Sequence, residues 1–106
     1  MDINQTRIIT WTAPTHRTDG APIVGTLSYL VEVVDSNNGV RQFPTTSTTM
    51  ELNFSQEGYR PGDYTVYVRA VEEYGAQGRV SDRSNGFPLS LESVANPEAP
   101  TNLKVE

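Results

Sequence analysis

The chain has 106 residues, a formal net charge of −5 at pH 7 and no cysteine. A chain of this length forms one domain, which buries roughly 65% of the surface that its unfolded form exposes and so has a core without cross-links. The lack of cysteine excludes disulfides, thiolate metal sites and cysteine nucleophiles, and the acidic balance disfavours a nucleic-acid partner. No apolar run is long enough to predict a membrane-spanning helix, and no export signal is visible.

The first half of the chain contains short runs that alternate apolar and polar side chains, which is the period of a β-strand with one buried face. Residues 6–12 predict a first strand with Ile9 and Trp11 on its inner face. Pro14 ends that strand because proline has no backbone N–H to donate. Residues 28–34 alternate in the same way and predict a second strand.

A tight hairpin is predicted next, at Asn37-Asn38-Gly39, because these residue types adopt positive φ readily. Residues 40–43 should therefore fold back antiparallel on the preceding strand, and Pro44 indicates that they lie at a sheet edge. Residues 50–54 alternate again and predict a further strand with one inward face.

Residues 64–71 give the clearest strand signal, since they are mostly β-branched or aromatic and every second side chain from Tyr64 is expected to point into a core. Residues 72–78 are predicted as a solvated acidic loop. A last strand is expected between residues 80 and 91, broken near residues 86–88. No stretch keeps apolar residues at helical spacing for three turns, so the predicted fold class is all-β with about seven strands.

Many short strands, frequent turns and one early tryptophan are typical of an immunoglobulin-like β-sandwich. Four segments carry a family resemblance: Ile9-Thr10-Trp11-Thr12-Ala13-Pro14, Asp19-Gly20-Ala21-Pro22-Ile23, Pro61-Gly62-Asp63-Tyr64-Thr65-Val66 and Val68-Arg69-Ala70-Val71. They resemble the fibronectin type III family over about residues 6–91. The resemblance implies a two-layer sandwich, with Trp11 in the core and the Tyr64 hydroxyl bonded to nearby backbone at a corner. Residues 24–28 are extra, and Tyr59 replaces a leucine that the family usually has slightly further upstream.

The two ends of the chain depart most from that family. Its first strand, a Pro-x-x-Pro segment followed by alternating apolar residues, has no counterpart before residue 6, whereas residues 96–105 have this form. We therefore divide the chain into a sandwich, residues 1–92, and a Pro-containing tail, residues 93–106. The residues of this tail that we expect to donate a strand are Ala99, Pro100, Leu103 and Val105.

Three arrangements of the tail are open from the sequence. The tail begins another repeat or lies free, or it inserts beside its own first strand as in a circularly permuted sandwich, or it completes the sandwich of a second copy, head to tail. Residues 92–98 reach roughly 25 Å when extended, about the length of the strand they must pass, so chain length permits insertion into the same molecule.

No pattern predicts catalysis, a metal site or a cofactor. His16, the only histidine, lies in a polar loop with no Ser-His-Asp arrangement around it. Glu72, Glu73 and Asp82 lack the spacing of a Ca²⁺ loop. Loops at the ends of sandwiches carry binding in related architectures, and a tyrosine there offers contact surface. The expected partner contacts in the loop after residue 71 are Tyr74, Glu72, Glu73 and Gln77.

The expected function is a non-enzymatic structural or protein–protein interaction module. Because the resembled family recurs in bacteriophage virion proteins, adhesins and secreted bacterial glycosidases, a short polar chain with its own Met is expected to be a surface or tail component of a virion or other displayed assembly, located on the virion surface or outside the cell. The alternative is an accessory spacer or carbohydrate-binding domain of a secreted bacterial enzyme or adhesin. The expected partner is a protein, including copies of this chain joined through the tail, with carbohydrate as the alternative ligand, and without nucleic acid or membrane insertion.

Overall fold

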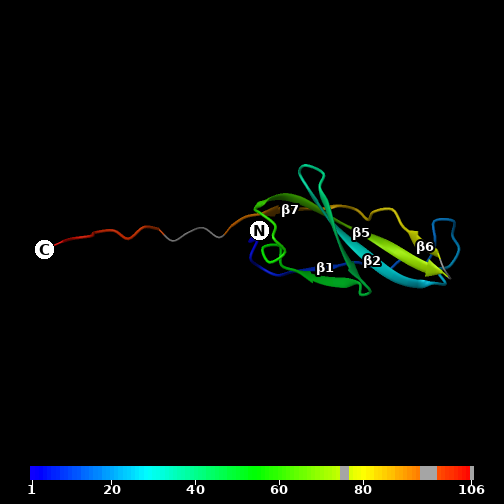
Figure 1. Cartoon of the computed structure of the whole chain (residues 1–106). Helices are drawn as coiled ribbons and strands as arrows, with labels where there is room; N and C mark the ends of the chain where they lie inside the picture. The colour runs from blue at the N-terminus through cyan, green and yellow to red at the C-terminus, as the bar shows by residue number, and fades with distance from the viewer. Residues whose placement is uncertain (75–76, 94–97, 106) are drawn as a thin grey trace.

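The protein consists of β-strands joined by turns and loops (Figure 1). The structure is a computed structural model that describes residues 1–74, 77–93 and 98–105. These residues form seven strands and no helix, which confirms the predicted all-β class. The strands are β1 (Arg7–Thr10), β2 (Thr26–Asp35), β3 (Val40–Thr45), β4 (Thr49–Leu52), β5 (Gly62–Tyr74), β6 (Gln77–Val80) and β7 (Phe87–Leu91).

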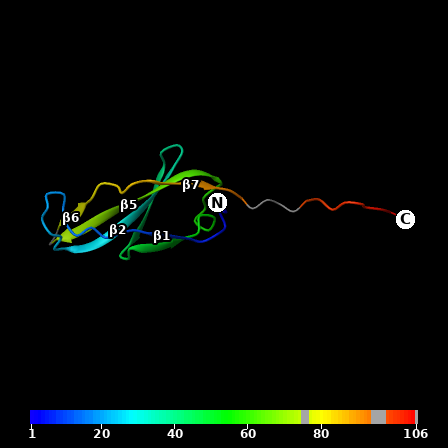
Figure 2. The ribbon, with the colours of Figure 1, turned by 180° about the vertical axis from the view of Figure 1, so that it is seen from behind.

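Two sheets of unequal width face each other (Figures 1 and 2). The narrow sheet pairs β1 with β4, antiparallel. The wide sheet has the order β3-β2-β5-β6, and β7 pairs with the first part of β5 while β6 pairs with its last part. Along the final edge of the wide sheet, β6 and β7 follow each other, and the edge is interrupted at residues 81–86. A break is present, but it lies earlier than the predicted position near residues 86–88, because Phe87 and Pro88 pair with Val66 and Thr65 inside β7.

The core lies between the sheets and is built from alternate residues of the strands. On β2, Val31 and Val33 are almost fully buried, as the period of two predicts. On β5, Val66 is buried, with Tyr64 and Val68 packed against the same cluster. The buried members of the cluster are Ile3, Val31, Val33, Leu52, Phe54, Val66, Leu89 and Leu91.

The predicted hairpin joins β2 to β3, with Val34 opposite Val40. Asp35 holds its turn, because its Oδ1 accepts the N–H groups of Asn37 and Gly39 at 2.9 and 2.8 Å. Asn38 has a φ of 64°, the left-handed value that its residue type tolerates. β3 lies at the edge of the wide sheet, so the edge position predicted from its proline is confirmed.

The chain turns into β5 through an aromatic corner. The Tyr64 hydroxyl donates to the Arg60 carbonyl at 2.6 Å, so the bond that the resemblance implied is present. The Tyr59 ring lies 5.2 Å from the Tyr64 ring and 5.4 Å from the Phe54 ring, centroid to centroid. The Arg41 guanidinium covers Tyr59 at 4.9 Å from its centroid. The departure at Tyr59 thus adds an aromatic ring that packs against the core.

The prediction of a solvated loop at residues 72–78 is wrong. β5 continues to Tyr74 and pairs there with β6, with Glu73 opposite Gly78, while the start of β2 lies along its other side. The strand persists because both of its edges find partners, so its backbone groups are bonded in the sheet and not to water. Residues 75 and 76 lie outside the described part of the chain.

The first three residues close one end of the sandwich. The Ile3 N–H donates to the Glu92 carbonyl at 2.8 Å, and the Ser55 N–H donates to the Ile3 carbonyl at 3.1 Å. Asp2 bridges Glu92 in the parallel direction, and the Ile3 side chain is buried. Residues 1–3 form this single bridge and no strand, and they do not extend beside β1, which pairs only with β4 among the described strands.

The tail described at residues 98–105 contains no strand and lies away from the two sheets (Figure 1). Leu103 and Val105 are each 92% exposed. Across the described chain, we find no helix with the length and hydropathy needed to cross a membrane.

Removing the corner hydroxyl tests the contribution of this turn. Tyr64→Phe is expected to lower the free energy of unfolding by about 1 kcal/mol, because the substitution deletes one hydrogen bond and keeps the ring. Urea denaturation measures the change. Tyr67→Phe is the matched control, since within the described residues the Tyr67 hydroxyl makes no hydrogen bond, and an equal loss in both variants would contradict the assignment.

Candidate functional site

A groove runs along the open edge of β1, between the narrow sheet and β7, with a volume of about 680 Å³. Phe54, Val66 and Val68 belong to the core and also line it, so the groove opens onto core side chains. The remaining lining residues belong to β1 and the residues on either side of it, to β7, and to the loop between β6 and β7. They are Met1, Arg7, Ile8, Ile9, Thr10, Trp11, Thr12, Ser84, Asn85, Phe87 and Leu89.

The edge of β1 that faces this groove carries unpaired backbone groups. Among the strands that the structure describes, β1 pairs only with β4. The Trp11 N–H donates to the Thr48 carbonyl at 3.1 Å, and hydrogen-bonded residues alternate in an antiparallel ladder. Ile8 and Thr10 therefore direct their N–H and C=O groups to the open side. Such an edge is a template for a further strand.

Apolar side chains line the groove and its rim. Ile8 is 68% exposed and Phe87 is 62% exposed, on opposite sides of the opening. Trp11 is half-buried and meets the Tyr29 ring edge-on at 5.4 Å between centroids. The resemblance implied that Trp11 lies in the core. The ring does pack against the core, but it is only half-buried and also lines the groove.

Two buried donors at the groove have no acceptor among the described residues. They are Trp11 Nε1 and Arg7 Nε, each on a residue that lines the groove. A buried donor without an acceptor costs about 1–3 kcal/mol. Both atoms are shielded from solvent, so this cost belongs to the packing beneath the groove and not to its exposed surface.

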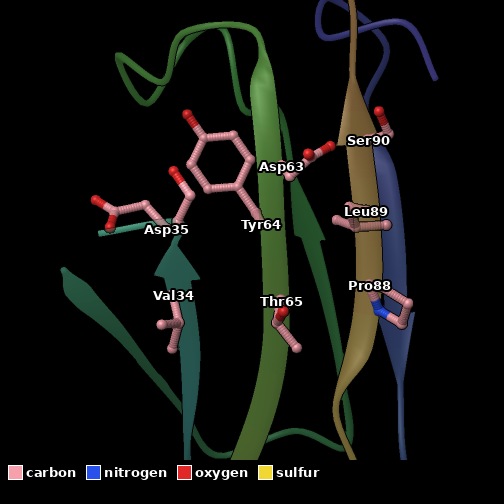
Figure 3. A pocket seen from close by; sticks show the side chains of 9 residues that line it. Val34, Asp35, Asp63, Tyr64, Thr65, Pro88, Leu89 and Ser90 are labelled. Carbon is pink, nitrogen blue, oxygen red and sulfur yellow. The ribbon is translucent and has the colours of Figure 1, made fainter. Parts of the chain in front are cut away.

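A second hollow, of about 340 Å³, lies on the wide sheet near the turn into β5 (Figure 3). Asp35 and Asp63 both line it, and Figure 3 shows the Tyr64 ring between them. The Asp35 carboxylate is already used by the hairpin, so these two residues do not form a carboxylate pair for acid–base chemistry. Within the described residues, no three His, Asp or Glu side chains gather as metal ligands.

Glu72, one of the expected partner contacts, is used inside the protein. It is 6% exposed, and the Arg17 guanidinium donates to it through Nε at 2.8 Å and through Nη2 at 2.9 Å. The N–H groups of Val24 and Gly25 donate to the same carboxylate at 3.2 and 3.1 Å. The Arg17 hydrogen bond and these two backbone donors lower the pKa of Glu72 from 4.5 to about 2, against desolvation.

The extra residues 24–28 explain this arrangement. A Cβ at Gly25 would lie 2.1 Å from the Glu73 carbonyl oxygen, so only glycine lets this segment approach β5 closely enough for its N–H to reach Glu72.

The other expected partner contacts differ from Glu72. Glu73 is exposed. Tyr74 and Gln77 face each other across the ladder, and their side chains lie outside the described part of the structure. His16 is exposed and bonds to its neighbour Thr15.

A polar cluster on the outer face of the wide sheet was missed from the sequence. Glu32 Oε1 accepts Arg69 Nε at 2.6 Å and Arg83 Nε at 3.0 Å, and its Oε2 accepts Gln42 Nε2 at 3.0 Å. Burial alone would raise the pKa of Glu32, but these hydrogen bonds outweigh it and hold the pKa below its ordinary value. The Arg83 guanidinium also covers the Tyr67 ring, at 4.7 Å from its centroid. These partners come from separate strands and a loop, so the register between the strands determines that their side chains meet.

In comparisons with family models, curated proteins and solved structures, the chain has no match.

The Glu72 contacts predict a pH dependence of stability. Glu72→Gln is expected to lower the free energy of unfolding at neutral pH, and this loss should shrink as the pH falls from about 4.5 to about 2. The reason is that a carboxyl with a lowered native pKa stabilises the fold above its unfolded pKa and loses that effect as the pH falls through its native pKa. Urea denaturation over this pH range measures the difference between variant and parent.

The matched control for this prediction is Glu73→Gln, which changes the exposed neighbouring carboxylate. It should alter stability little at any pH, because exposed charges far from partners contribute little. A Glu72→Gln effect that stays constant down to pH ~2 would show that the carboxylate charge is not what Arg17 and the two backbone donors stabilise.

Proposed function

We propose that the chain is a non-enzymatic structural module that binds a protein partner by taking up an extended segment beside β1. The observation that carries this proposal is the groove itself, in which an unpaired strand edge faces an apolar floor. Addition of a strand to such an edge is a recurring mode of protein recognition, in which main-chain hydrogen bonds give affinity and alternate side-chain pockets give specificity.

We further propose that the sandwich is of the fibronectin type III kind. What supports this is the set of four sequence segments together with the Tyr64–Arg60 corner and a half-buried Trp11 on the first strand. By analogy with the uses of that family, the chain would serve as a surface or tail component of a bacteriophage virion or other displayed assembly, on the virion surface or outside the cell.

The alternative is a spacer or carbohydrate-binding domain of a secreted bacterial enzyme or adhesin. The observation that favours it is aromatic surface at the groove, where Trp11 and Phe87 could pack against a sugar ring. Strand addition is preferred, because the backbone groups of Ile8 and Thr10 need partners in a row along the strand and a peptide supplies them at that spacing.

Fluorescence of Trp11 tests the two candidates directly, since it is the only tryptophan in the chain and lines the groove. Titration with a soluble synthetic peptide that alternates threonine and valine is expected to give a saturable change in emission. Titration with cell-wall and plant polysaccharides is expected to give none.

The control pair Thr10→Pro and Thr10→Ala locates the binding edge. Proline removes the backbone N–H on the open side and should weaken peptide binding about fivefold or more, whereas alanine keeps the N–H and should leave the affinity close to that of the parent. Saturation by a polysaccharide with no response to the peptide would support the carbohydrate alternative. Silence with both ligands would overturn the proposed binding surface.

A further inference from the structure

We infer that the segment taken up by the groove is the tail of a second copy of this chain, residues 98–105, so that copies join head to tail. This inference rests on the proposed function and names its partner. The groove offers an open strand edge above apolar side chains, and the tail is a free segment with the matching pattern.

The tail has the side-chain pattern that the groove requires. Leu103 and Val105 are 92% exposed, although large aliphatic side chains are usually buried. They alternate with Asn102 and Lys104, so in an extended conformation the two apolar side chains lie on one face and the polar ones on the other. The apolar face matches the groove, and the polar face would be directed to water.

Strand directions decide which copy can donate the tail. Residues 1–3 lie beside Glu92 and Ser55, so β7 ends and β1 begins at the same end of the sandwich. A strand that lies between β7 and β1 and runs antiparallel to β1 must run parallel to β7, towards the end where β7 finishes. In a neighbouring copy of the same orientation, placed beyond the opposite end of the groove, the tail continues in the direction of that copy's β7. The tail of that copy therefore enters the groove in the required direction.

The same directions disfavour insertion of the tail into its own molecule. The tail leaves the body at Glu92, so it would have to return along the whole groove before entering antiparallel to β1. Residues 93–98 span at most about 20 Å when fully extended, about the length of residues 7–12, which line the groove. The sequence alone suggested that this reach permits insertion into the same molecule. The structure corrects this expectation, because the tail starts at the end of the groove where it would have to finish, and no length remains for the reversal of the chain.

The free tail is not preformed as a strand. Asn102 has a φ of 60°, so insertion must bring this residue to an extended backbone and fix the segment. The ordering cost makes association of isolated copies weak, and a scaffold that holds neighbours together would raise the effective concentration enough to fill the grooves. Assembly is therefore expected to depend steeply on concentration.

Disulfide trapping tests the inference cleanly, because the chain has no cysteine of its own. Full-length chains carrying Thr10→Cys in the acceptor groove are mixed with full-length chains carrying Lys104→Cys in the tail. Both side chains lie on the outward face of the predicted strand pair, where cross-strand Cα separations suit a disulfide. We expect mixed dimers to form, with a yield that rises with concentration.

Two controls separate insertion from random collision. Adding Leu103→Asp to the donor chain should lower the yield about tenfold or more, since it places a charge where the apolar contact would be. Replacing the acceptor with Glu51→Cys puts an exposed cysteine on β4, no residue of which lines the groove, and should give only the collision yield. Equal yields for Thr10→Cys and Glu51→Cys acceptors would overturn the inference.

A chain carrying both Thr10→Cys and Lys104→Cys distinguishes the same molecule from a second one. Concentration-independent formation of an intramolecular disulfide at high dilution would show that the tail fills its own groove, and would overturn the head-to-tail assembly. If the threonine–valine peptide binds the groove but the tail cysteine traps nothing above the collision yield, the proposed function stands and this inference fails.

Discussion

The narrow sheet of β1 and β4 covers only part of the inner face of the wide sheet, and most features of the molecule follow from this mismatch. Packing between facing sheets buries β2 and the middle of β5, where Val31, Val33 and Val66 form the centre of the core. Beyond β1, no strand of the described chain continues the narrow sheet. The groove is the part of the core that this sheet leaves uncovered, which explains why core residues such as Val68 line an open hollow.

Polar contacts hold the wide sheet in place at the positions where it is least covered. Glu72 ties the loop at Val24 and Gly25 to the end of β5, and Glu32 ties both arginines of the outer face to the middle of β2. Each carboxylate is shielded from water and has its oxygens bonded by several donors, the condition under which a buried charge is tolerated. These contacts connect segments far apart in the sequence, namely two loops to β5 and β2.

The short parallel contact of residues 1–3 with Glu92 defines the end of the groove at which a further strand would finish. Ile3 is buried there and completes the apolar cluster, so this end of the space between the sheets is already filled. The remaining length beside Ile8 and Thr10 has the two properties of an internal strand position, unpaired backbone on one side and apolar side chains beneath.

Much of the architecture was predictable from the sequence, because alternation of side chains is a local property. The period of two located the strands up to residue 71 and their inner faces, Asn-Asn-Gly located the hairpin, and Pro44 indicated the edge. The corner at Tyr64 followed from a short motif whose hydrogen bond spans four residues. Local sequence determines such features, since the residues that interact are close together in the chain.

The tertiary structure decided what depends on contacts between distant residues. Residues 72–74 had the composition of an acidic loop, yet pairing with β2 and β6 keeps them in a strand, and Arg17 turns Glu72 from an expected partner contact into a buried one. The groove also has no local signature, because it exists only where β1, β7 and the core meet. The sequence by itself determined most of the strands, because side-chain alternation is local. Register and the unequal widths of the two sheets, which depend on distant contacts, placed the open edge of β1 beside core side chains.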